Sequence, residues 1–301
     1  MKPNVGFIGA GLMGHGVARN ILEKGYALSV LGHRNRGSVD DLVRRGAREL
    51  KSPAELAAQS DVLFTCLPNS EVVEQVVCGE EGVLEEAREG LVLVDLTTGA
   101  PEATRRIAAR AAKKGVRMLD APMTLTPKEA EEGRLNLLVG GDPALFEELR
   151  PIFLTFNERI FHVGPLGAAH TLKLINNFLS QGNLALVVLA MTTATRAGVD
   201  ARMMHDVISV SGGNSVVFQR ASRIFLGDET GGGGAFAIKN ALKDVRYFTE
   251  LAEAQGVYAP LADAVRRFFH LAVALDYGEE LLPKLFEVQD RLSGGGRKAG
   301  G

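Results

Sequence analysis

The stretch Val5-Gly6-Phe7-Ile8-Gly9-Ala10-Gly11-Leu12-Met13-Gly14 decides the fold of this chain. Residues 5–8 predict a short buried strand, and residues 14–24 have the pattern of a helix. The glycines between them have the spacing G-x-G-x-x-G. In such a turn the first glycine reverses the chain, the second lets a phosphate approach the backbone, and the third lets the helix lie close to the strand. Because free N–H groups at a helix start attract phosphate, the stretch predicts a dinucleotide site made by Gly9, Ala10, Gly11, Leu12, Met13 and Gly14.

The rest of the first half alternates short apolar runs with helical stretches. Such alternation is typical of a parallel sheet covered by helices. The sequence therefore predicts the α/β class, with an N-terminal Rossmann-type parallel sheet domain for dinucleotide binding at residues 1–164. Its strands are predicted at Val5–Ile8, Leu28–Leu31, Val62–Leu67, Leu91–Leu96, Val116–Ala121 and Leu135–Val139.

The pattern changes after the breaker cluster Gly164-Pro165-Leu166-Gly167. About thirty residues from Ala168 to Ala197 contain no proline and are apolar on most sides, which predicts one long buried helix between the domains. Residues 165–293 should form an all-helical domain for substrate binding and dimerisation, with a flexible loop at Gly231–Gly234 and a disordered tail at 294–301. The large apolar face of the long helix predicts a homodimer or homotetramer. Further helices are predicted at Ala201–Val210, Ser215–Phe225, Phe236–Gln255, Pro260–Leu275 and Glu279–Leu292.

Composition and charge argue against several other classes of protein. The 34 Lys and Arg residues are balanced by 36 Asp and Glu residues, so we expect no nucleic-acid surface. No secretion signal follows Met1, and the longest strongly apolar stretch, Leu184 to Met191, is shorter than the ~20 residues of a membrane span. Cys66 and Cys78 make no disulfide framework. These features predict a cytoplasmic protein that acts on a small molecule, without nucleic-acid or membrane partners.

The end of the second predicted strand bears on the choice between NAD and NADP. An NAD site usually has Asp or Glu about 20 residues after the glycines, where it accepts a hydrogen bond from the ribose 2′-hydroxyl. This chain has Gly32-His33-Arg34-Asn35-Arg36 there, and no acid before Asp40. Arg34 and Arg36, with His33 beside them, can pair with a 2′-phosphate. The sequence therefore favours NADP, with NAD as the alternative, although a solvated basic loop explains the same residues.

A lysine stands in the first turns of the long predicted helix, in Lys173-Leu174-Ile175-Asn176-Asn177. Lys173 and Asn177 are four residues apart and project from one face of the helix. Burying a charged lysine costs free energy, so the side chain either reaches water from an apolar face or is held in a polar pocket for chemistry. The residues alone leave both alternatives open.

Several ordered motifs together resemble the β-hydroxyacid dehydrogenase family, which includes 3-hydroxyisobutyrate dehydrogenase and tartronate semialdehyde reductase. The resemblance extends from Val5 to about Leu292. It implies an NAD(P)-dependent oxidoreductase that interconverts a small β-hydroxy acid and its aldehyde or keto form by hydride transfer. The motifs are the glycine turn, Asp120-Ala121-Pro122, the strand from Gly133 to Gly141, the K-x-x-x-N of Lys173 and Asn177, and Lys243-Asp244.

The resemblance also implies roles for individual residues. Lys173 matches the catalytic lysine, and Asn177 matches the asparagine that holds this lysine and the substrate. Thr98 matches a threonine near the nicotinamide, Leu67-Pro68 matches the loop along the adenosine-side ribose, and Lys243 matches a lysine that closes over the cofactor. For Thr98 and Lys243, a helix cap and a solvated helix face are the alternatives.

The implied chemistry needs a proton acceptor beside the hydride acceptor. The cofactor takes the hydride while Lys173 takes the hydroxyl proton as general base, or returns it in the reverse direction. Lysine at its ordinary pKa of about 10.4 is a poor base near neutral pH. Burial and an oxidised, cationic nicotinamide both disfavour the ammonium form and should lower the pKa of Lys173. No metal is required, and no spacing of His, Asp and Glu predicts one.

One loop departs from the family pattern. Where the family has Ser-Gly-Gly to hold the substrate carboxylate, this chain has Met123-Thr124-Leu125-Thr126. Thr124 can keep the hydroxyl contact, so it joins Lys173 and Asn177 as a predicted catalytic residue. Leu125 and Thr126 add side chains and should deny the backbone the dihedral angles that glycine adopts. The loop, with Lys173 and Asn177, is therefore predicted to form a reshaped pocket for a carboxylate-bearing substrate.

Two other functions fit the same fold. An imine reductase would also use NADP and a reshaped pocket, but those proteins usually lack the lysine, so Lys173 argues against that activity. A non-catalytic NADP-binding or scaffold protein would keep the fold without its chemistry. Cofactor binding without turnover of any hydroxy acid, aldehyde or imine would favour the scaffold.

Overall fold

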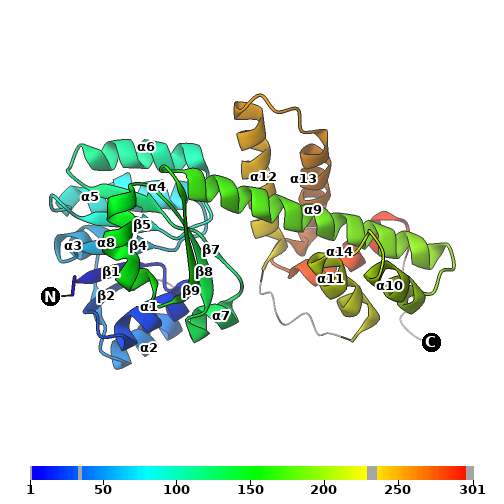
Figure 1. Ribbon diagram of the computed structural model, residues 1–301, viewed down its shortest axis with the longest axis horizontal. Helices are drawn as coiled ribbons and strands as arrows, with labels where there is room; N and C mark the ends of the chain where they lie inside the picture. The colour runs from blue at the N-terminus through cyan, green and yellow to red at the C-terminus, as the bar shows by residue number, and fades with distance from the viewer. Residues whose placement is uncertain (1, 33–35, 229–235, 296–301) are drawn as a thin grey trace. The chain divides into compact units, whose positions relative to one another are not determined.

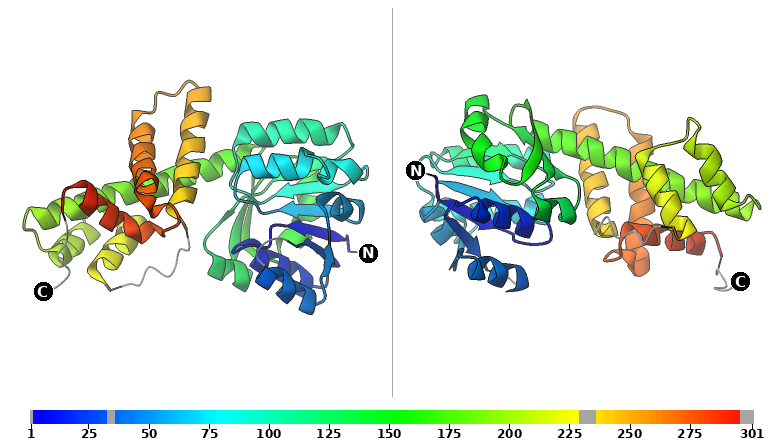
Figure 2. Two further views of the ribbon diagram at one scale, coloured as in Figure 1. Left: turned by 180° about the vertical axis from the view of Figure 1, so that it is seen from behind. Right: turned by 60° about the horizontal axis from the view of Figure 1, so that its bottom comes forward.

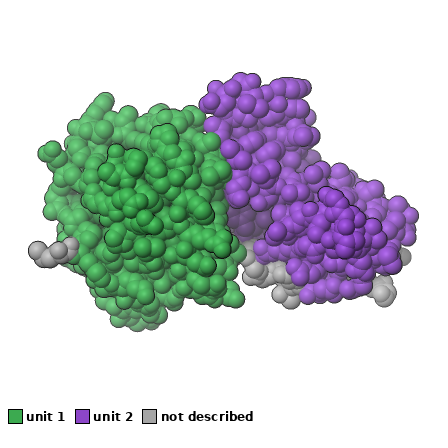
Figure 3. Space-filling view, in the orientation of Figure 1, with its two compact units in different colours: residues 1–173 green, residues 174–301 purple. Residues whose placement is uncertain are grey.

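The computed structural model describes residues 2–32, 36–228 and 236–295 (Figure 1). The chain divides into two compact units, Met1–Lys173 and Leu174–Gly301, which we call unit 1 and unit 2 (Figure 3). His33, Arg34 and the predicted loop Gly231–Gly234 lie outside the described residues, as does the end of the predicted tail, residues 296–301.

Unit 1 is built on a sheet that has nine strands within the described residues (Figure 1). The strand order is β3-β2-β1-β4-β5-β6-β8-β7, and β9 pairs with β8. Pairing is parallel from β3 to β6, as predicted, whereas β8 runs antiparallel to both β6 and β7. The bounds are β1 Val5–Ile8, β2 Leu28–Leu31, β3 Arg48–Leu50, β4 Val62–Thr65, β5 Val92–Asp95, β6 Arg117–Asp120, β7 Met123–Thr124, β8 Leu135–Gly140 and β9 Asn157–Gly164.

Helices cover both faces of this sheet (Figures 1 and 2). One face packs on apolar side chains of α1, α2, α7 and α8, and the other packs on α3, α4, α5 and α6. Strands β1 and β4 are therefore buried along their whole length, as expected for parallel strands covered on both sides. The bounds are α1 Gly14–Glu23, α2 Arg36–Arg44, α3 Pro53–Ala58, α4 Ser70–Cys78, α5 Val83–Glu86, α6 Pro101–Ala112, α7 Pro127–Glu132 and α8 Pro143–Phe153.

The register of the central strands aligns their carboxyl ends at one edge of the sheet. Thr65, the last residue of β4, pairs with Ile8 on one side and with Asp95 on the other, and Asp95 pairs with Asp120. The carboxyl ends of β1, β4, β5 and β6 thus lie in one row. Ligands of open parallel sheets bind at this edge, and here the glycine turn follows β1.

Unit 2 is helical within the described residues, as predicted, apart from an isolated bridge between Ala237 and Leu281. Its core includes Val188 and Phe269, both fully buried. The helix predicted up to residue 275 ends at Ala272, because the π turn that follows contains Asp276 in a left-handed conformation with a φ of +69°. The bounds are α9 Ala168–Arg196, which starts in unit 1, α10 Ala201–Ser209, α11 Val216–Leu226, α12 Ile238–Ala254, α13 Pro260–Ala272, η1 Val273–Tyr277, η2 Leu282–Lys284 and α14 Leu285–Leu292.

Among the described residues, α9 is the one helix that is long and apolar enough to cross a membrane. The expectation that no segment reaches that length is therefore wrong, because the apolar character extends well beyond residues 184–191. The core helix of a soluble protein passes the same test. Leu179, Leu186 and Leu189 are exposed on α9. The predicted homo-oligomer would cover such side chains, and it stays a prediction.

Candidate active site

The glycine turn after β1 has the geometry that a phosphate site requires. Gly9 has a φ of +101°, and a Cβ there would lie 2.2 Å from the carbonyl oxygen of Cys66. A Cβ at Gly14 would lie 2.1 Å from the carbonyl oxygen of Gly9, whereas a Cβ at Gly11 would meet nothing within 4 Å. The protein itself therefore requires glycine at positions 9 and 14. At position 11 the open space suits the approach of a ligand to the backbone.

The start of α1 offers backbone donors beside that space. Within the described residues, no side chain caps the helix at Met13, and its first turn holds no acidic residue. Leu12 is exposed in the same turn. Uncapped N–H groups with no carboxylate among them suit an anion. The turn is thus built as the predicted pyrophosphate site needs.

Arg36, at the start of α2, is engaged by two carboxylates. Its guanidinium donates to both oxygens of Glu49 (2.6 and 3.0 Å) and to Asp40 Oδ1 (2.7 Å). These hydrogen bonds, first those to Glu49, raise the pKa of Arg36, and Arg36 lowers the pKa of Glu49. Glu49 lies on β3, a strand that the sequence did not predict. The pairing of this acid with Arg36 was therefore not predicted either. A 2′-phosphate at Arg36 would compete with these carboxylates for the guanidinium.

A hydrogen bond joins the loop after β4 to the loop after β5. Asp95 Oδ1 accepts a hydrogen bond from Thr97 N (3.0 Å), and Leu67 N donates to Thr97 Oγ1 (3.0 Å). A Cβ at Gly9 would lie 3.2 Å from a methyl group of Leu67. The structure therefore brings the predicted residue Leu67, and the loop of Thr97 and Thr98, to the edge that carries the glycine turn.

Asp120, at the end of β6, holds the start of α9. Its carboxylate accepts hydrogen bonds from Gly167 N (2.7 Å) and His170 N (2.8 Å), and it is fully buried. A carboxylate at the positive end of a helix dipole stabilises that helix end. Lys173 is half-buried and lies one turn further along α9. The motif that begins with Asp120 therefore fixes the part of the helix that carries the predicted catalytic lysine.

In unit 2, Asn177 and Lys243 share a buried acid that is not among the predicted site residues. Asn177 Nδ2 donates to Asp244 Oδ2 (2.6 Å), and Lys243 Nζ lies 3.2 Å from Asp244 Oδ1. Asp244 is 1% exposed, and the Lys243 side chain is 15% exposed, so the alternative of a solvated helix face does not hold. Asp244 stands beside Val245 on the buried face of α12. A charged residue on a buried helix face needs partners. An acid among the apolar residues of this face was therefore the sequence signal that could have identified Asp244.

The predicted substrate loop keeps a backbone conformation that glycine favours. Leu125 has a φ of +83° and is 53% exposed. The expectation that side chains exclude such angles is therefore wrong at Leu125, where the surrounding contacts offset a cost of about 1–2 kcal/mol. Asn136 Nδ2 donates to Thr124 Oγ1 (3.2 Å), and Thr126 N donates to Glu129 Oε2 (3.0 Å) in a capping box that starts α7. The loop is thus held on both sides of Leu125.

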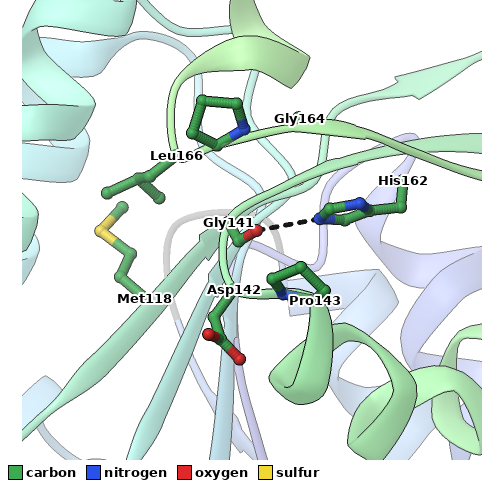
Figure 4. Close-up of a pocket in the computed structure, with 8 residues that line it drawn as sticks. Met118, Gly141, Asp142, Pro143, His162, Gly164 and Leu166 are labelled. Carbon is green, nitrogen blue, oxygen red and sulfur yellow. Dashed lines mark hydrogen bonds between the residues drawn. The ribbon is translucent and has the colours of Figure 1, made fainter.

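The pocket in Figure 4 is a separate feature of unit 1. It has a volume of about 520 Å³ and lies beside the start of α8. His162 Nε2 donates to the carbonyl oxygen of Gly141 (2.9 Å) at its wall. None of the described residues predicted for the site lines this pocket, so it does not belong to the candidate site. Its lining is Met118, Gly141, Asp142, Pro143, His162, Gly164, Pro165 and Leu166.

Comparison with known proteins assigns both parts of the chain. Residues 4–164 match the family described as the NAD binding domain of 6-phosphogluconate dehydrogenase. Residues 167–281 match the family described as the NAD-binding domain of NADP-dependent 3-hydroxyisobutyrate dehydrogenase. Together the two matches cover the glycine turn, the sheet and most of the helical unit.

Full-length relatives agree with this assignment. The chain is 32% identical over 295 residues to 2-(hydroxymethyl)glutarate dehydrogenase of Eubacterium barkeri, and the match covers 96% of each protein. It is 30% identical over 298 residues to the NAD-dependent L-serine dehydrogenase of Pseudomonas aeruginosa, covering 94% of this chain and 97% of that one. A solved structure, Psf3 in complex with NADP+ and 2-OPP, is similar with a TM-score of 0.80 and 27% identity, covering 95% and 99% of the two chains.

Motifs, fold and relatives therefore lead to one assignment. The chain is an NAD(P)-dependent dehydrogenase or reductase that acts on a CH–OH group. Its cofactor is a nicotinamide dinucleotide, since both family models describe NAD-binding domains. The roles of single residues, Lys173 among them, stay predictions. This chain belongs to the β-hydroxyacid dehydrogenase family.

Proposed function

We propose that this chain interconverts a small β-hydroxy acid and its aldehyde or keto form, with NADP as hydride carrier and Lys173 as general acid and base. The observation that carries the proposal is the anchoring of α9 by Asp120. Asp120 fixes His170 N at the carboxyl end of β6, and Lys173 follows one helical turn later. The glycine turn and the loop of Thr97 lie at the same edge of the sheet. A lysine fixed in this way suits proton transfer better than one on a mobile surface.

The names of the two full-length relatives support the substrate class. 2-(Hydroxymethyl)glutarate and L-serine both carry a hydroxymethyl group on the carbon next to a carboxylate. Each is therefore a β-hydroxy acid whose oxidation at that group gives an aldehyde. We extend this chemistry to the present chain, whose proposed substrate is a carboxylate-bearing acid with a hydroxyl group on its β-carbon.

In the proposed mechanism, different residues bind the cofactor, transfer the proton and position the lysine. NADP, once bound, accepts the hydride or returns it. The uncapped N–H groups of α1 would hold the pyrophosphate. Lys173 would take the hydroxyl proton during oxidation and return it to the carbonyl oxygen during reduction. Asn177 projects from the same face of α9 as Lys173, and its hydrogen bond to Asp244 fixes its amide.

A substrate panel followed by the absorbance of reduced cofactor tests this function. The panel holds β-hydroxy acids, the matching aldehydes, and imines. We expect turnover of at least one pair of hydroxy acid and aldehyde. An imine as the best substrate would assign an imine reductase, and NADP binding without any turnover would assign a scaffold.

Charge reversal at the end of β2 tests the preference for NADP. Arg34→Glu with Arg36→Glu should weaken NADP binding about 100-fold and NAD binding less than about threefold, because only NADP carries the 2′-phosphate that the arginines can grip. Arg44→Glu is the matched control, since Arg44 lies at the other end of α2 and pairs with Asp41. Fluorescence titration measures both dissociation constants. Equal losses for the two cofactors would show that the arginines do something else.

The left-handed Leu125 leads to a prediction about specificity. Leu125→Gly should raise kcat/KM for 3-hydroxyisobutyrate, relative to the best substrate of the panel, by about 10-fold, since one apolar side chain discriminates by about 1–3 kcal/mol. It should also relieve backbone strain and leave stability equal or higher. Leu154→Gly is the control, because Leu154 is a similarly exposed leucine (56%) at the end of α8. If the wild type already prefers 3-hydroxyisobutyrate, the loop does not set specificity.

A further inference from the structure

His170 is a fully buried histidine, three residues before Lys173, to which the proposed mechanism gives no role. Its Nδ1 lies 2.7 Å from Thr104 Oγ1. Its Nε2 has no hydrogen-bond partner among the described residues and lies 4.0 Å from Asp95 Oδ2. Its Nδ1 also lies 4.0 Å from Asp120 Oδ2. The ring is therefore placed between two buried carboxylates, at the ends of β5 and β6.

The contact of His170 with Thr104 fits either protonation state of Nδ1. Thr104 Oγ1 lies 3.2 Å from the carbonyl oxygen of Ala100, which also accepts the helical N–H of Thr104 (3.1 Å). The single hydroxyl proton can therefore be donated to Ala100 or to His170 Nδ1. The carboxylates of Asp95 and Asp120, each 4.0 Å from a ring nitrogen, are the two buried acids whose charge an imidazolium at this position would offset.

The two carboxylates beside His170 hold the two parts of the candidate site in unit 1. Asp95 accepts the N–H of Thr97, in the loop that the resemblance places near the nicotinamide. Asp120 accepts N–H groups from the first turn of α9, His170 N among them. The ring is also closely packed, since a Cβ at Gly99 would lie 3.2 Å from its Cε1. A change in the ring would therefore be transmitted to both parts.

We propose that His170 is a positioning residue, an imidazolium bridge between Asp95 and Asp120 that aligns the turn of α9 carrying Lys173 with the loop of Thr97 for hydride transfer. Its complete burial means that it acts through these neighbours and not by touching the substrate. This inference rests on the proposed function of Lys173.

Two variants test whether the charge of His170 and the charge of Asp95 act together. His170→Gln removes the ring charge and should lower kcat with the best β-hydroxy acid of the panel at least about tenfold, with KM for NADP+ changed less than about twofold, because alignment and not binding is lost. Adding Asp95→Asn removes the negative charge beside the replaced ring and keeps an oxygen for the Thr65 hydroxyl and for Thr97 N–H. The double variant should return kcat to within about threefold of wild type, since the two residues act as one unit.

His205→Gln is the matched control, because His205 bonds the hydroxyl of Ser222 at 2.7 Å in unit 2. It should leave kcat unchanged. A wild-type kcat in His170→Gln, or losses in His170→Gln and Asp95→Asn that add in the double variant, would overturn the proposal.

A spectroscopic test uses the wild-type protein and so does not depend on how a variant folds. Nitrogen-15 spectra of histidine-labelled protein, assigned through bonds, should show both ring nitrogens of His170 protonated at neutral pH. A single neutral tautomer would contradict the bridge. Lys173→Ala, assayed in parallel, separates the two claims. Wild-type turnover in Lys173→Ala would contradict the proposed function. Lost turnover in Lys173→Ala together with wild-type turnover in His170→Gln would contradict only the role of His170.

Discussion

Replacing Lys173 by alanine is expected to lower kcat by about 10²–10⁴-fold, the usual contribution of a positioned acid or base. The variant should fold and bind NADPH normally, because Asp120 holds the start of α9 through the backbone N–H groups of Gly167 and His170. Turnover of the best β-hydroxy acid of the panel measures the loss. Added methylamine should restore part of the rate, since it can take the proton that the missing side chain took.

Lys239→Ala is the matched control for this result. Lys239 lies at the start of α12, where its side chain is half exposed and pairs with Glu279 at 2.6 Å. That variant should turn over substrate like the wild type. An undiminished rate in Lys173→Ala, or an equal loss in Lys239→Ala, would contradict the role given to Lys173.

The glycine turn should give the second large effect, and two substitutions there should separate folding from binding. In Gly9→Ala the new Cβ would lie 2.2 Å from the Cys66 carbonyl oxygen at a φ of +101°. It should lower the free energy of unfolding by about 3–5 kcal/mol. In Gly11→Ala the Cβ would meet nothing within 4 Å, so stability should change by less than about 1 kcal/mol. NADPH binding should nevertheless weaken about 10- to 100-fold, because the methyl group would block charge-assisted bonds to the pyrophosphate.

Urea unfolding and fluorescence titration of NADPH measure these two effects. Each variant serves as the control for the other, since they differ by two positions in one turn. Wild-type affinity in Gly11→Ala would place the pyrophosphate elsewhere. Wild-type stability in Gly9→Ala would contradict the close approach of β1 and the loop after β4.

The regular strands could be predicted because their sequence pattern is local. β1 and β2 begin and end where the apolar runs predicted. β3 and β7 were missed because neither contains an apolar run: Arg48–Leu50 has two exposed charged residues, and Met123–Thr124 has two residues in all. They are strands because they pair with β2 and β8. Pairing between distant segments decided these two elements, and a local pattern does not contain it.

The candidate site shows the same division between local motifs and distant contacts. The glycine turn and the spacing of Lys173 and Asn177 can be read along the chain. The partners of two acids could not be predicted, because Glu49 reaches Arg36 through the pairing of β3, and Asp244, which lies 67 residues along the chain from Asn177, reaches it from α12. The sequence therefore predicts which groups could react, and the fold determines which acids hold them.

Hydride transfer itself is the central claim, and isotope transfer tests it most directly. The wild-type protein is mixed with NADP+ and with the best β-hydroxy acid of the panel, carrying deuterium on the carbon that bears the hydroxyl group. Mass spectrometry of the reduced cofactor should show one deuterium gained for each aldehyde or ketone formed, because the hydride moves directly between the two carbons. Reduced cofactor without deuterium, or no reduced cofactor with any acid of the panel, would contradict the account.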